Sequence, residues 1–140
     1  MSDLEMEKES LRYLAEFQQD LEEVEQLVLK LSGEESHRDV FAKINRIVHS
    51  LKGTAGGYGF NLLSIACHKI EDLLASKDYG GSEKLIDEIF DITDTMIKIC
   101  KAYREKNSKE ISFYKHKLGA SNLDKGPSEL VLIPNEKIAA

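Results

Sequence analysis

The chain is 140 residues long, which is enough for one domain with a proper core and too short for a second catalytic module. Hydrophobic residues make up 41% and charged residues 31%, an ordinary composition for a soluble folded protein. The formal net charge of -6 argues against nucleic acid as a partner, because the phosphate backbone favours basic surfaces.

The first predicted helix runs from about Leu4 to Leu31. Its apolar residues recur every three or four positions, the spacing of a helix that buries one face: Leu14, Phe17, Leu21, Val24, Val28 and Leu31. Both prolines of the chain come near its end, which suits a chain that is helical almost throughout. Ser32 and Gly33 are predicted to end this helix, because glycine readily adopts the left-handed turn that follows a helix.

A second helix is predicted to begin near Ser36, which can cap it. Its buried stripe consists of Phe41, Ile44, Val48, Leu51 and Ala55. His49 directly follows Val48 and is therefore rotated off this stripe toward solvent. The glycine-rich segment 56–59 is predicted to end the helix, because glycine lowers helix propensity and permits unusual turns.

A third helix is predicted over about Leu62 to Ser76, with Asn61 as its N-cap. A glycine-containing turn separates it from a fourth helix, which starts near Ser82 and ends at Asn107-Ser108. A short fifth helix is predicted from Ile111 to Leu118.

These elements predict an all-α fold, an antiparallel four-helix bundle with a short fifth C-terminal helix and a tail. We expect the bundle to occupy residues 1–118 and residues 119–140 to form a flexible tail or linker. The charged outer faces leave no second apolar stripe, so a monomer is expected.

The same sequence features indicate where the protein resides. No apolar run approaches the length of a membrane span, and no signal-peptide pattern opens the chain, so we expect a cytoplasmic protein without membrane contact. Cys67 and Cys100 can in principle pair, but in this setting we expect two buried, reduced thiols.

The most informative segment is 49–60, with the sequence HSLKGTAGGYGF. It places His49, Lys52 and Gly53 at i, i+3 and i+4, so that the three residues share one exposed helix face. An imidazole can accept a phosphoryl group, and a neighbouring ammonium attracts the phosphoryl oxygens. Bare backbone at the glycine leaves room for a partner. The segment therefore predicts a histidine that carries a phosphoryl group and presents it.

The third predicted helix supplies a carboxylate for this histidine. His68 and Glu71 are spaced i, i+3 and share a face that is off the buried stripe. If the second and third helices are antiparallel neighbours, these residues lie about as far beyond the turn as His49 lies before it. A carboxylate hydrogen-bonded to one imidazole nitrogen fixes the tautomer and makes the other nitrogen more basic.

Segment 41–74 resembles the signature of histidine-containing phosphotransfer (HPt) domains. Within that family it is most similar to the phosphorylatable N-terminal domain of CheA-type chemotaxis histidine kinases. The resemblance implies that His49 is the phosphoryl acceptor through Nε2, with Glu71 accepting a hydrogen bond from Nδ1. It also implies that Lys52 attracts the phosphoryl oxygens and that His68 tunes the same hydrogen-bonded network.

The resemblance further implies the partners. A histidine kinase catalytic domain, or a phosphorylated receiver domain, would transfer the phosphoryl group to His49, which would pass it to an aspartate of a response-regulator receiver domain. The domain would then be a phosphoryl carrier and kinase substrate rather than an enzyme. It would need no cofactor of its own, since magnesium and ATP are supplied by partner domains. Both a free-standing HPt protein and the N-terminal piece of a larger chemotaxis kinase fit.

Gly53 has a separate expected role. Glycine within a helix costs about 1 kcal/mol relative to alanine, so its presence beside the histidine predicts that a receiver needs the space. The small residues Ala42 and Gly56, together with Phe60, are expected to extend this docking surface.

Two other functions are compatible with a helical bundle. One is an interaction module that binds a receiver or kinase without phosphotransfer; the presence of the histidine with its lysine and glycine argues against it. The other is a metal site built from His49, His68 and Glu71, which Lys52 would oppose by repelling a cation. No glycine-rich phosphate loop of the Gly-x-x-x-x-Gly-Lys type is present.

Overall fold

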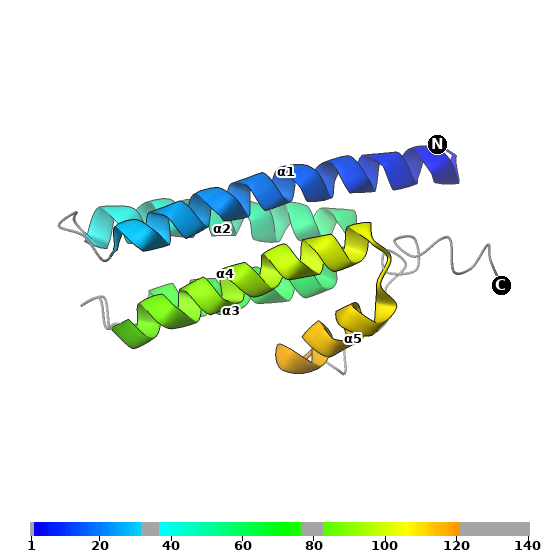
Figure 1. Cartoon of the computed structure of the whole chain (residues 1–140). Coiled ribbons are helices and arrows are strands. Elements are labelled where there is room, and N and C mark those ends of the chain that lie inside the picture. The colour runs from blue at the N-terminus through cyan, green and yellow to red at the C-terminus, as the bar shows by residue number, and fades with distance from the viewer. Residues whose placement is uncertain (1, 32–36, 77–82, 121–140) are drawn as a thin grey trace.

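The computed structural model describes residues 2–31, 37–76 and 83–120 and contains five α-helices in that part of the chain. The helices are α1 (Asp3–Lys30), α2 (His37–Tyr58), α3 (Asn61–Ala75), α4 (Glu83–Arg104) and α5 (Ser108–Lys117). The four long helices lie side by side and alternate in direction, and α5 folds back against α4 (Figure 1). The predicted all-α bundle with a short fifth helix is confirmed.

The core lies between the four long helices. Helix α2 packs against α1 and α3, and α4 packs against the same two helices from the other side. The largest fully buried side chains come from every long helix and from the connections between them: Leu14, Phe17, Leu21, Leu31, Phe41, Ile44, Phe60, Leu62, Leu63, Ile70, Ile89 and Tyr103. Every residue of the two predicted buried stripes, which lie within 14–31 and 41–55, is buried.

The end of α2 differs from the prediction. The helix continues through Gly56 and Gly57 to Tyr58, and only Gly59, with φ +83°, leaves the helical conformation. The Gly59 N–H donates to the Gly56 carbonyl at 3.0 Å, and the Phe60 N–H donates to the Ala55 carbonyl at 2.8 Å. These two bonds are the Schellman motif, in which one residue of positive φ closes a helix. One glycine, not three, is needed to stop α2.

The start of α3 also differs. Phe60, rather than the predicted Asn61, occupies the N-cap position, and it makes no side-chain cap bond. Phe60 is fully buried, so the expectation that it belongs to an exposed docking surface was wrong. Its ring lies in an aromatic cluster at the α2–α3 end of the bundle, 5.7 Å from the ring of Tyr13 and 5.2 Å from that of Tyr103. Burial of a large apolar side chain outweighed local capping preference at this position.

The remaining predicted boundaries fall close to the observed ones. Helix α1 spans Asp3–Lys30, with Ser2 accepting a cap bond from the Glu5 N–H at 3.2 Å. Helix α5 begins three residues before the predicted Ile111, because Asn107 caps it by accepting from the Glu110 N–H. The predicted turn residues 32–33, the candidate cap at 36, the turn before α4 and residues 121–140 of the tail lie outside the described residues.

Candidate functional site

His49 is exposed on α2 because it lies one residue past the buried stripe of that helix. Val48 is fully buried, and the His49 side chain, one residue further on, is 70% exposed. Lys52, three residues later, lies at the edge of the α2–α3 contact with its side chain about one third exposed. The predicted exposed face of this helix is therefore present, with the imidazole outermost.

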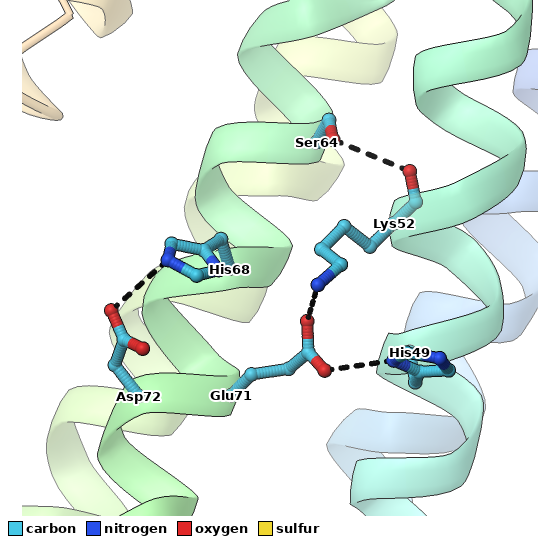
Figure 2. A network of polar contacts seen from close by, with 6 residues as sticks. All are labelled: His49, Lys52, Ser64, His68, Glu71 and Asp72. Atoms are coloured by element: carbon cyan, nitrogen blue, oxygen red, sulfur yellow. Dashed lines mark hydrogen bonds and ion pairs between the residues drawn. The ribbon is translucent and has the colours of Figure 1, made fainter.

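Glu71 on α3 joins both α2 residues. Its Oε2 lies 2.9 Å from Nδ1 of His49, and its Oε1 lies 2.7 Å from Nζ of Lys52. Its side chain is only 18% exposed, so the carboxylate lies in the seam between the two helices (Figure 2). The structure thus brings together three of the predicted site residues, and each carboxylate oxygen has its own partner.

The charge of Glu71 follows from this environment. Burial raises the pKa of its carboxyl, but the hydrogen bonds and charges of Lys52 and His49 outweigh that effect and hold the pKa below its ordinary value. Glu71 is therefore ionised at neutral pH. An ionised carboxylate only accepts hydrogen bonds, so Nδ1 of His49 carries the proton in this contact. In the neutral imidazole the exposed Nε2 then keeps a free lone pair, which is the state required of a nucleophile.

His68 lies on the same side of α3 but has a different partner. Its Nε2 lies 3.5 Å from Oδ2 of Asp72, one turn further along the helix, and both side chains are mostly exposed (Figure 2). His68 and Lys52 line one open cavity of about 530 Å³ along the α2–α3 seam, together with Asn61, Ser64, Ile65, Lys69 and Asp72. The structure therefore places His68 beside the His49–Glu71–Lys52 contacts, with Asp72 as its polar partner.

The glycines of α2 have unequal surroundings. A Cβ on Gly53 would meet nothing within 4 Å, so the surface one turn beyond His49 is open. A Cβ on Gly56 would lie 3.8 Å from Oγ of Ser64 on α3. The Ser64 hydroxyl donates to the backbone carbonyl of Lys52 at 3.3 Å. Ala42, the other small residue predicted on this face, is exposed.

Two contacts of the site were missed by sequence reasoning, Ser64 to the Lys52 carbonyl and Asp72 to His68. The spacing carried a signal for the Asp72 contact and for the Ser64 side of the other one. Ser64 lies seven residues before Glu71 and so shares its helix face, and Asp72 lies four residues after His68. A backbone carbonyl as the acceptor has no sequence signal at all.

Two further features of the bundle concern metal binding and membrane crossing. Among the described residues, no group of three or more His, Cys, Asp and Glu side chains is arranged to hold a metal ion. In the same part of the chain, no helix has both the length and the apolar character needed to cross a membrane.

The structure is thus a helical bundle with an exposed imidazole whose Nδ1 is hydrogen-bonded to a carboxylate. The family model described as the Hpt domain matches residues 11–118, and the chain belongs to this family. Hpt domains carry a phosphoryl group on histidine in two-component signalling, and they interact with kinase and receiver domains as phosphocarriers rather than catalysts. Neither the curated proteins nor the solved structures contained a match to the chain.

Proposed function

We propose that His49 is the phosphoryl acceptor of this Hpt domain, with Nε2 as the attacking atom. The observation that carries the proposal is the hydrogen bond of 2.9 Å between Nδ1 and the ionised Glu71, on a side chain that is otherwise 70% exposed. That bond leaves the lone pair on the nitrogen that faces solvent. Family membership supplies the class of reaction.

In the transfer step, the Nε2 lone pair attacks the phosphorus of the donor. The N–P bond forms while the bond between phosphorus and the donor oxygen breaks, and that oxygen leaves with its electron pair. The Nδ1 proton stays on the ring, and Glu71 stabilises the positive charge that develops there, as a preorganised carboxylate can. In the reverse sense, a carboxylate oxygen of a receiver aspartate attacks the phosphorus and Nε2 leaves.

The first role of Lys52 is to bind Glu71. Its ammonium lies 2.7 Å from Oε1, which keeps the carboxylate ionised and oriented toward His49. As a flexible point charge beside the acceptor, it is also placed to attract phosphoryl oxygens. His68, with Asp72, is proposed to act on the same site from the neighbouring cavity.

The partners belong to the same proposal. A histidine kinase catalytic domain supplies ATP and magnesium and phosphorylates His49, and a response-regulator receiver domain accepts the group with its own magnesium. The resemblance of segment 41–74 to the N-terminal domain of CheA-type kinases makes a chemotaxis-type kinase catalytic domain the first donor to test. On this proposal the domain acts in the cytoplasm as a monomer and needs no cofactor of its own.

Replacing His49 with glutamine tests the proposal directly. The purified chain is incubated with the kinase catalytic domain and labelled ATP, and protein-bound label that is acid-labile and base-stable is measured. We expect label on the native protein and none on His49→Gln. Because the His49 side chain is 70% exposed, solvent replaces part of the lost hydrogen bond, so we expect the free energy of unfolding to fall by less than the roughly 1.5–3 kcal/mol that a hydrogen bond to a charged group contributes.

Phosphoramidate, a small phosphoryl donor, serves as the control for a mismatched kinase. Label that persists on His49→Gln with either donor would move the acceptor to another residue. A native protein that takes no label from either donor would favour the interaction module without phosphotransfer.

A further inference from the structure

Lys52 is held by α3 at both of its ends. Its ammonium is bound by Glu71 at 2.7 Å, and its backbone carbonyl accepts a hydrogen bond from the Ser64 hydroxyl at 3.3 Å (Figure 2). Ser64 and Glu71 are seven residues apart, about 10 Å along one face of α3. Two points of α3 are thus attached to one residue of α2.

The Ser64 contact departs from the usual behaviour of serine in a helix. A serine hydroxyl within a helix commonly bonds the carbonyl four residues earlier in its own helix. Thr93 does so in α4, whereas the Ser64 hydroxyl reaches across to α2 instead. It adds a second donor to a carbonyl that already belongs to the α2 ladder.

Gly56 leaves room for this approach. It lies one turn beyond Lys52 on α2, and a Cβ placed on it would lie 3.8 Å from Oγ of Ser64. An alanine there would make ordinary contact, but a longer side chain would meet the hydroxyl or separate the helices. Gly57, by contrast, has nothing within 4 Å of a Cβ.

We infer that Ser64 is a positioning residue for the proposed phosphoryl acceptor, and that the small residue at position 56 leaves room for it. By holding the Lys52 carbonyl, Ser64 fixes the separation and register of α2 and α3 at this level. The Glu71 carboxylate then reaches Lys52 and His49 at the same time. The inference deepens the proposed function and, for its effect on transfer, rests on it.

The test compares Ser64→Ala with Ser64→Thr, which keeps a hydroxyl. The first measurement is the tautomer of His49 in the unphosphorylated protein, from the ¹⁵N chemical shifts of its ring nitrogens. The second is the rate of phosphoryl acceptance from phosphoramidate, which needs no docking partner. For Ser64→Ala we expect a smaller fraction of the Nδ1–H form and acceptance slowed roughly three- to tenfold, the effect of one lost hydrogen bond.

Ser64→Thr should restore both readings toward those of the native protein. Gly56→Leu should lower both, whereas Gly57→Leu, the matched control in the same helix, should leave them unchanged. Native tautomer fractions and rates in Ser64→Ala would overturn the inference, and so would a loss that follows the melting temperature and that threonine does not restore. If the native protein accepts no phosphoryl group, the proposed function fails, while the tautomer measurement still decides the role of Ser64.

Discussion

At the scale of single residues, Glu71 has the largest influence on the site. Its two oxygens serve two residues of another helix, and its low pKa depends on both of them. It is also mostly covered, whereas His49 is mostly exposed. The proposed acceptor therefore has little packing around it, and its orientation comes from a neighbour that is mostly covered.

Substitutions of Glu71 should separate the effect of its charge on phosphoryl acceptance from the effect of its shape. Glu71→Ala removes the acceptor for Nδ1–H, and a hydrogen bond to a charged group contributes about 1.5–3 kcal/mol, so we expect acceptance from phosphoramidate to slow by about tenfold or more. Glu71→Gln keeps an oxygen that accepts from Nδ1–H but loses the charge that attracts Lys52. Its rate should therefore fall between those of the native protein and Glu71→Ala. Rates are measured under single-turnover conditions, and an alanine variant within twofold of the native protein would show that His49 needs no carboxylate.

The residue types at the site could be predicted from the sequence, but not all of their contacts. The i, i+3 and i+4 spacing placed His49, Lys52 and Gly53 on one face, and the antiparallel arrangement brought Glu71 to them. The partner of His68 was not predicted, because a histidine on a helix surface has acceptors within its own helix as well as across the seam. Choosing between them requires side-chain conformations, which spacing does not determine.

At the scale of helices, α2 combines a buried stripe with an open surface around Gly53. Nothing in the described bundle lies within 4 Å of the position of a Cβ there, so the glycine is not required by internal packing. The positions of Gly53 and His49 around the helix, off the buried stripe, were predictable from the apolar pattern. The point at which the helix ends was not, because a glycine inside a helix and a glycine that closes one look alike in sequence.

Enlarging Gly53 should therefore affect docking rather than folding. Alanine at this position should raise the free energy of unfolding by up to about 1 kcal/mol, since helix propensity increases and nothing clashes. Gly53→Leu should keep native acceptance from phosphoramidate but slow transfer to a receiver domain. Gly57→Leu is the control, and equal transfer rates for the two leucine variants would contradict a docking role specific to Gly53.

At the scale of the whole molecule, the core and the site occupy different surfaces of the same helices. Cys67 and Cys100 lie in the core, where the Cys67 thiol contacts the sulfur of Met96 at 3.7 Å. Burial raises the pKa of each thiol to about 12. It also raises the pKa of Tyr13 above its ordinary value, despite the hydrogen bond from Tyr13 to Thr54. The prediction of two buried, unpaired cysteines is confirmed.

These shifts predict a loss of stability in alkali. In the unfolded chain the thiols titrate near pH 9, whereas in the folded protein they stay protonated to about pH 12. Between these values the unfolded state binds fewer protons, so the free energy of unfolding falls as pH rises, by at most about 1.4 kcal/mol per pH unit for each thiol.

Urea titrations between pH 8 and pH 11 measure this dependence. A variant with alanine at both cysteine positions should show a smaller slope, with a contribution from Tyr13 remaining above about pH 10. A native protein whose unfolding free energy is constant over this range would contradict the prediction.

The connection between α2 and α3 has one more consequence. Only Gly59 and Phe60 separate the two helices, and both are fixed, one by its positive φ and the other by burial. Adding or removing one residue within α3 ahead of Glu71 would turn the carboxylate by about 100° around the helix axis, away from His49. The interval of 22 residues between His49 and Glu71 therefore determines whether their side chains meet. Insertions and deletions within this interval would disrupt the pair.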